Sequence, residues 1–248
     1  MVAEKPAGHS REYMFVAAAR RLLRHTTIFV GVGEPAVPCA MAHKLRPETL
    51  LVYESGIIGA QPIRTYSIGD SRLVDGASAL CSLLDLFALM LQGGKIDVAV
   101  TGAAQVDRYG NLNTTCIGDY ARPQVRLPGS GGAADIAAFA QSTLILASHE
   151  RRRFPPEVDF ITSPGHRIHG RTRIELGLPG AGPAAIVTDL GIFEFSAAGE
   201  AVLTQVHPDV MPEMVAEQTG WNLLVADDLT ITPPPSEREL RALAEVVA

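Results

Sequence analysis

The hydrophobic pattern of the first half of the chain alternates between two periods. Short apolar runs bounded by Gly or Pro have the length of buried strands, and apolar residues between them recur at helical spacing. Strands and helices of these lengths, taken in this order, pair in parallel, so the pattern predicts an α/β layer. The expected strands lie at 27–30, 49–52 and 96–100. The first expected helix is capped at its start by Ser10 and has apolar positions at Phe15, Val16, Leu22 and Leu23; two more are expected at 36–45 and 77–91, the last of them buried.

The second half alternates apolar strands with turns. The prolines at 155–156 and the Gly- and Pro-rich stretch 177–183 are typical of loops and not of a domain linker. No internal repeat interrupts the chain, so we expect residues 1–248 to form a single domain. The expected strands lie at 143–146, 158–161, 185–188, 201–204 and 223–225, and the expected helices at 212–219 and 236–247.

Composition narrows the classes of protein that the chain can belong to. With 248 residues, 47% of them hydrophobic, it can bury an ample core. A net charge of −6 without a long Lys/Arg stripe argues against nucleic acid or an anionic membrane as the main partner. The longest apolar stretch, 77–91, contains Asp85 and is short for a membrane span, and the N-terminus lacks an apolar signal region. We therefore expect a cytoplasmic protein.

The cysteine and histidine spacing gives little support to a metal site. Cys39, Cys81 and Cys116 lie far apart, as free thiols do in an intracellular protein. His166 and His169 are close in sequence, but no third ligand is near them. We expect two exposed loop histidines and no metal.

Glu54 lies at the end of an expected strand, a position that suits a catalytic or binding residue. Glu54 directly follows the apolar run 49–52 and Tyr53, and Gly56 after it allows a sharp turn. Ligands bind at such strand ends in open α/β sheets. Burying an ionised side chain there costs free energy, so such a side chain is expected to have a function. The alternative is that Glu54 ends the strand and points into water.

Two further stretches follow strands and carry groups that can bind a ligand. The segment 102–115 is rich in amides and glycines and offers neutral donors and acceptors, although its Tyr109-Gly110-Asn111 also suits the turn of a hairpin. The stretch 128–132 places small residues ahead of an Ala-rich helix. Exposed N–H groups at Gly131 and Gly132 would favour an oxyanion, and the alternative is a flexible loop.

Taken together, these motifs resemble the β subunit of the family I CoA-transferases over most of the chain. Residues 54–59 resemble that family's Glu-Asn-Gly-x-x-Gly, residues 102–113 its Gly-Ala-x-Gln-Val-Asp-x-x-Gly-Asn-x-Asn, and residues 129–135 its Gly-x-Gly-Gly-Ala-x-Asp. Ser55 departs from the commoner Asn. The segments 188–193 and 206–208 lean toward the glutaconate-type branch, which uses a separately encoded α subunit. The order of several motifs is more specific than any one of them.

The resemblance implies an open, mostly parallel sheet flanked by helices and a ping-pong transfer of CoA between an acyl-CoA and a carboxylic acid. Glu54 would be the nucleophile and would carry a glutamyl-CoA thioester. A backbone N–H of Gly131 or Gly132 would stabilise the oxyanions. No permanently bound cofactor is expected, because the coenzyme A thioester is the substrate. The implied partner is an α subunit, in a heterodimer or a heterotetramer.

Other residues receive lesser roles from the same resemblance. Gln105, Asn113 and Ser55 are candidates for orienting the acyl or carboxylate group. Asp107 and Asp135 are expected to be structural, as a turn residue and a helix first-turn carboxylate. Three arginines could pair with the distal carboxylate of a dicarboxylic substrate or could be surface charges. They are Arg64, Arg72 and Arg122.

Two alternatives to transfer stay open at this point. Relatives of the same fold act as acyl-CoA hydrolases or decarboxylases, usually where the nucleophilic glutamate is displaced or replaced. The presence of Glu54 favours transfer, although water that reached the thioester would give hydrolysis. The other alternative is a non-catalytic scaffold that binds CoA or supports its partner subunit.

Overall fold

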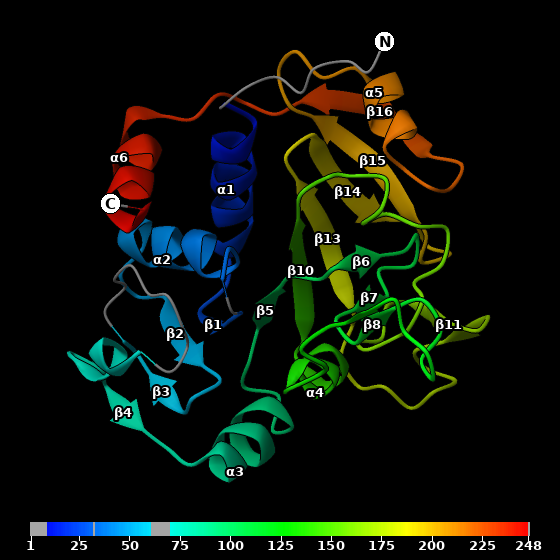
Figure 1. Ribbon diagram of the computed structural model, residues 1–248. Coiled ribbons are helices and arrows are strands. Elements are labelled where there is room, and N and C mark those ends of the chain that lie inside the picture. Colours follow the sequence, from blue (N-terminus) through cyan, green and yellow to red (C-terminus); the bar gives the residue numbers. More distant parts are fainter. Residues whose placement is uncertain (1–8, 32, 61–69, 248) are drawn as a thin grey trace.

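A ten-stranded sheet organises the chain, of which the computed structural model describes residues 9–31, 33–60 and 70–247. Neighbouring strands from β2 through β1, β5 and β10 to β13 pair in parallel, and hairpins extend both ends (Figure 1). The predicted open, mostly parallel sheet is therefore confirmed. In sheet order the strands are β16 (Leu224–Ile231), β15 (Ala201–Val206), β14 (Gly191–Phe195), β13 (Pro183–Thr188), β10 (Ser142–Ala147), β5 (Val98–Thr101), β1 (Thr27–Val30), β2 (Leu50–Tyr53), β3 (Ile57–Ile58) and β4 (Ala79–Leu80).

Both faces of the central strands are buried because successive side chains point to opposite sides. In β1, Ile28 and Val30 join one apolar cluster and Phe29 joins another. The first cluster packs under three helices that lie together on one face (Figure 1). These are α1 (His9–Leu22), α2 (Ala36–Leu45) and α6 (Glu237–Val247).

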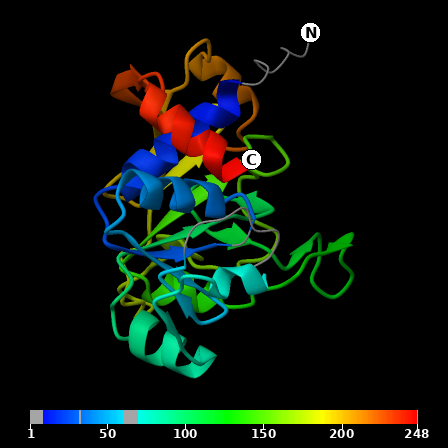
Figure 2. The same cartoon turned by 90° about the vertical axis from the view of Figure 1, so that its left-hand side faces the viewer.

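The opposite face carries shorter elements and the loops that form the site. Over the strands β1, β2 and β5 this face is covered by α4 (Ala133–Phe139) and by η2 (Leu86–Leu91), a π-helix that continues α3 (Leu83–Asp85). The hairpin β8–β9 projects from the body of the molecule (Figure 2). The remaining elements are η1 (Ser71–Val74), β6 (Gln105–Val106), β7 (Leu112–Asn113), β8 (Cys116–Ile117), β9 (Val125–Arg126), β11 (Arg167–Ile168), β12 (Arg171–Thr172) and α5 (Pro212–Glu217).

The predicted buried helix 77–91 is wrong in both length and burial. Residues 79–80 pair with β3 as an edge strand, and helical structure begins only after Ser82, whose Oγ accepts a hydrogen bond from the Asp85 N–H at 3.1 Å. Ser at an N-cap fixes the start of a helix in this way. Several leucines of the segment are exposed to solvent.

The predicted strand 158–161 is irregular. The Asp159 N–H donates to Gln105 Oε1 at 3.0 Å, and Asp159 Oδ2 accepts from the Gly118 N–H at 2.9 Å. A side-chain acceptor therefore occupies the Asp159 N–H, which a strand ladder would use. The strand expected at 223–225 is confirmed and extends to Ile231 as β16. Among the described residues, no helix combines the length and the apolar character needed to cross a membrane.

The C-terminal helix α6 provides a test of stability that does not involve the site. Arg20 of α1 donates from Nε and Nη2 to the two carboxylate oxygens of Glu239, at 2.6 and 2.8 Å. These bonds, helped by Ser236, lower the pKa of Glu239 to about 2. We expect Glu239→Gln to lower the free energy of unfolding by about 1–2 kcal/mol at pH 7.

The pH dependence of this effect has a definite sign. Because the folded pKa is depressed, the stabilisation is present above the unfolded pKa of about 4.3 and is lost as pH falls toward 2. Denaturant unfolding of the wild type and of Glu239→Gln should show that their difference in free energy of unfolding shrinks as the pH falls from 7 toward 2. The control is Glu245→Gln, because the exposed Glu245 pairs with Lys44 at the surface. A difference that persisted at pH 2 would contradict the assignment.

Candidate functional site

Glu54 lies in a tight turn that joins β2 to β3. The Gly56 N–H donates to the Tyr53 carbonyl at 2.9 Å, and Gly56 has φ +86°, which favours glycine. A Cβ on Gly56 would lie 2.2 Å from the Cys81 carbonyl oxygen, so no other residue fits there. The turn leaves the Glu54 side chain half-buried, while the neighbouring Ser55 is exposed.

The glycine-rich stretch meets this carboxylate. The Gly132 N–H donates to Glu54 Oε1 at 2.9 Å, across 78 residues of sequence. A Cβ on Gly132 would lie 2.9 Å from the same oxygen and 2.5 Å from Cζ of Phe87, and a Cβ on Gly131 would lie 3.5 Å from it. The predicted nucleophile and the predicted donor therefore lie together, and the absence of side chains on the two glycines makes the approach possible.

A cavity of about 490 Å³ opens beside the two glycines, at the carboxyl ends of β1 and β5. Its volume is in the range of small-molecule sites, and its position is where open α/β sheets bind ligands. Phe29, Val100, Leu127 and Ile136 make the walls mainly apolar, and Gly131 lines it next to Glu54. The described residues that line it include no charged side chain.

Thr101 supplies a polar group to this cavity that sequence reasoning did not single out. Its side chain is buried, and within the described part of the chain its hydroxyl has no hydrogen-bond partner. Two other hydroxyls on the cavity are engaged: Thr114 donates to the Gly129 carbonyl, and Ser130 accepts from the Ala134 N–H. A buried polar group without a partner is costly, so Thr101 is suited to meet a ligand.

The amide-rich segment forms the hairpin that was its alternative. Gln105 of β6 and Asn113 of β7 are opposite each other and buried. Asn113 Nδ2 donates to Gln105 Oε1 at 2.7 Å and to the Cys116 carbonyl at 2.6 Å, and its Oδ1 accepts from the Thr115 N–H at 2.9 Å. Gln105 Nε2 donates to Asp159 Oδ2 at 3.0 Å. These bonds engage both amides with each other and with residues 116 and 159, and neither residue lines the cavity beside Glu54.

The two aspartates lie where a structural role places them. Asp107 Oδ1 accepts from the N–H groups of Tyr109 and Asn111 at 2.9 and 3.0 Å and so shapes the hairpin turn. Burial raises the pKa of Asp107, and these hydrogen bonds oppose the rise. Asp135 lies in the first turn of α4, which follows Gly132.

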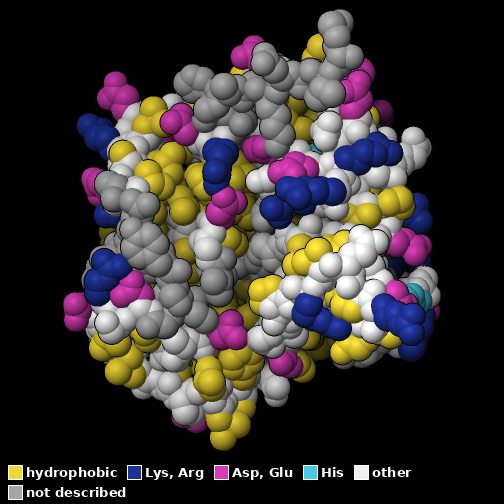
Figure 3. Space-filling model, in the orientation of Figure 1, with side chains coloured by type: hydrophobic (Ala, Val, Ile, Leu, Met, Phe, Trp, Pro, Cys, Tyr) yellow, Lys and Arg dark blue, Asp and Glu magenta, His cyan; other side chains and the backbone are white. Residues whose placement is uncertain are grey.

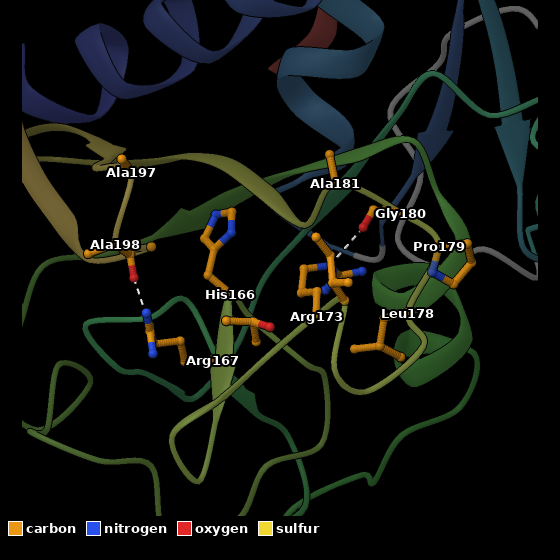
Figure 4. A pocket seen from close by; sticks show the side chains of 12 residues that line it. His166, Arg167, Arg173, Leu178, Pro179, Gly180, Ala181, Ala197 and Ala198 are labelled. Atoms are coloured by element: carbon orange, nitrogen blue, oxygen red, sulfur yellow. Dashed lines mark hydrogen bonds between the residues drawn. The ribbon is translucent and has the colours of Figure 1, made fainter.

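A buried arginine fixes the other end of α4. Figure 4 shows a second cavity, of about 420 Å³, with Arg173 and His166 on its wall. The five N–H groups of Arg173 have backbone carbonyl acceptors at 2.7–3.3 Å, which include Ala137 and Ala138 near the C-terminus of α4, and burial lowers the pKa of Arg173. His166 Nε2 bonds the Pro183 carbonyl at 2.8 Å. This cavity therefore contains a structural anchor that no local sequence pattern indicates.

Two of the three arginines considered for a distal carboxylate lie in the described part of the chain. Arg64 lies outside the described residues. Arg72 pairs with Asp70 at 2.6 Å, and Arg122 is exposed between β8 and β9. Within the described residues, no group of three or more His, Cys, Asp or Glu side chains is placed to hold a metal ion.

Comparisons with known proteins identify the family. The family model for coenzyme A transferases matches residues 11–218. The B subunit of 3-oxoadipate CoA-transferase from Pseudomonas knackmussii is 47% identical over 96% of this chain and 93% of its own. The B subunit of glutaconate CoA-transferase from Acidaminococcus fermentans is 34% identical over 91% of this chain and 87% of its own.

Solved structures agree in fold. The crystal structure of the Acidaminococcus fermentans glutaconate enzyme superposes with a TM-score of 0.86 and 31% identity, over 96% of this chain and 94% of that one. The decarboxylase AibA/AibB superposes with a TM-score of 0.82 and 27% identity, over the same shares. The chain belongs to the coenzyme A transferase family, as a family I CoA-transferase B subunit.

Proposed function

We propose that this chain carries the nucleophile of a ping-pong CoA-transferase, with Glu54 forming a glutamyl-CoA thioester. The observation that carries the proposal is the contact between the Glu54 carboxylate and the Gly132 N–H beside an apolar cavity. A carboxylate that is partly removed from water and held by one N–H is a positioned nucleophile that needs no separate base. The sequence similarity to two CoA-transferase B subunits supports the same reaction.

The proposed steps conserve the thioester. Glu54 Oε2 attacks the acyl carbon of the donor, the C–S bond breaks, and CoA leaves as a thiolate while a mixed anhydride remains. The thiolate attacks the Glu54 Cδ and expels the donor acid as a carboxylate, which leaves glutamyl-CoA. The acceptor carboxylate then attacks this thioester, and the same steps in reverse release the new acyl-CoA and the free Glu54 carboxylate.

The Gly132 N–H has a specific role in these steps. When the thiolate attacks Cδ, the negative charge develops on Oε1, which already accepts the hydrogen bond from Gly132. The donor is therefore in place before the charge forms, as electrostatic preorganisation requires. Gly131, with φ +48° and adjacent to the same oxygen, is proposed as the second part of this oxyanion site.

We propose dicarboxylic acids of the 3-oxoadipate type as substrates, in line with the name of the relative that is 47% identical. The apolar cavity suits the uncharged carbon chain next to the thioester, and the Thr101 hydroxyl would donate a hydrogen bond to a carbonyl oxygen of the substrate. Ser55, exposed next to Glu54, remains a candidate for orienting the carboxylate. A panel of acyl-CoA donors and acids, assayed with the co-expressed α subunit, tests this assignment.

The fold alone does not decide between transfer and other acyl-CoA chemistry. The AibA/AibB decarboxylase shares the architecture, so the choice depends on the site and not on the superposition. Glu54, in contact with Gly132, favours transfer over direct hydrolysis and over a scaffold without catalysis.

The first prediction concerns the nucleophile. Glu54→Gln retains an oxygen that can accept from Gly132 but loses the nucleophilic carboxylate, so we expect kcat of the α/β complex to fall at least about 10³-fold with the fold preserved. Glu48→Gln is the control, because Glu48 is an exposed carboxylate six positions earlier. Turnover of the Glu54→Gln variant within twofold of wild type would exclude catalysis by this chain.

The second prediction concerns the glycine donor. Gly132 has φ −83°, which alanine adopts without strain, but the added Cβ would crowd Glu54 Oε1 and Phe87. We expect Gly132→Ala to lower kcat by about 100-fold. Gly170→Ala is the control, because Gly170 has φ +80° and no atom within 4 Å of the added Cβ; it should cost stability and leave kcat unchanged. Equal kcat values for the two variants would contradict the assignment.

The third prediction separates activity from stability at Thr101. Thr101→Val keeps the shape of the side chain and removes a buried hydroxyl that has no described partner, so the free energy of unfolding should stay equal or rise by up to about 1 kcal/mol. We expect kcat/KM to fall about 3- to 10-fold, because a hydrogen bond to the substrate is lost. Thr49→Val removes a similar buried hydroxyl away from the cavity and should not change kcat/KM. A fall in both variants would contradict the role of Thr101.

A further inference from the structure

Four leucines form an exposed apolar surface on β4, α3 and η2, which we name the leucine patch. The patch consists of Leu80, Leu83, Leu84 and Leu89, which are 63%, 58%, 75% and 65% exposed. Figure 3 shows hydrophobic side chains gathered along the lower edge of the molecule, over the α3–η2 segment of Figure 1. Single exposed apolar residues are ordinary, but a contiguous group marks an interaction surface.

The patch is distinct from the core-facing leucines of the same segment. Leu86 and Leu91 of η2 are fully buried against Phe29 and Val52, so this segment already has a core-facing side. Leu83, Leu84 and Leu89 of the same helical segment, and Leu80 of β4 before it, are exposed to solvent. A helix that is apolar on two sides is expected where both sides are covered.

The same segment forms part of the wall of the Glu54 site. Phe87 of η2 lies against Gly132, since a Cβ added to Gly132 would be 2.5 Å from the Phe87 ring. The Phe87 ring also packs edge-on to the Phe29 ring, with the two ring centroids 6.3 Å apart. Cys81, next to Leu80, has its carbonyl against Gly56 of the Glu54 turn. A protein bound to the patch would therefore contact the segment that supports both Gly132 and the turn.

We infer that the leucine patch is the docking surface for the α subunit. The inference rests on the proposed two-subunit transferase. The relatives are B subunits, and the part of the cavity lining that the structure describes lacks the charged groups that would bind the acids or CoA. A partner seated on a surface that adjoins the site can supply them. Docking there would also fix η2 and, through Phe87, the Gly132 contact with Glu54.

The experiment measures the affinity of this chain for its α subunit in the analytical ultracentrifuge, without substrate. We expect Leu84→Asp and Leu89→Asp each to weaken the complex at least about 30-fold, because a charge placed in a buried apolar contact removes an anchor. Both side chains are exposed in the free chain, so far-UV circular dichroism and thermal unfolding should match wild type.

Ile174→Asp is the matched control. Ile174 is 90% exposed and apolar but lies by the Arg173 cavity, so its replacement should leave the affinity unchanged. Wild-type affinity in both leucine variants would overturn the inference. Self-association of the isolated chain that only the leucine variants abolish would also overturn it, because that result would assign the patch to contact with a second copy of this chain. The measurement needs no turnover, so if the chemistry proposed for Glu54 failed while the complex still bound through the patch, the docking inference would stand on its own.

Discussion

The hydrogen bond from the Gly132 N–H to Glu54 Oε1 is the interaction on which the site depends. It joins the turn after β2 to the start of α4, two segments that the chain brings together only through the parallel order of the sheet. The turn is fixed by Gly56, whose position against the Cys81 carbonyl admits no side chain. The Glu54 carboxylate is therefore placed by backbone geometry more than by side-chain partners.

The supports of this contact lie on both ends of α4. Phe87 packs against Gly132 at the start of the helix, and the carbonyls near its end accept from Arg173. A guanidinium whose N–H groups all reach carbonyls is a rigid anchor, because it offers five donors in a fixed plane. A displacement of about 1 Å in the reacting groups can cost a factor of about 100 in rate, which gives a physical reason for fixing a short helix so firmly.

Sequence patterns were informative where local interactions set the structure. Hydrophobic period and spacing predicted the strands at 27–30 and 49–52. The conformational preference of glycine predicted the turn at Gly56 and the glycines before α4. They were uninformative where the partner is distant. Gln105 and Asn113 are candidates for orienting the substrate group, and no local pattern indicated that their amides bond to each other and to residues 116 and 159. The apolar run 77–91 was expected to be buried, but four of its leucines are exposed, and composition alone does not distinguish an exposed apolar surface from a core.

The central claim is that Glu54 becomes covalently bonded to CoA during turnover. The most direct measurement is to incubate the α/β complex with acyl-CoA, reduce it with borohydride, and identify the modified residue by peptide mass spectrometry. The account predicts that the acyl-CoA makes the enzyme sensitive to borohydride and that the Glu54 side chain is recovered as the alcohol. Loss of activity with an unmodified Glu54, or full activity after reduction, would contradict it.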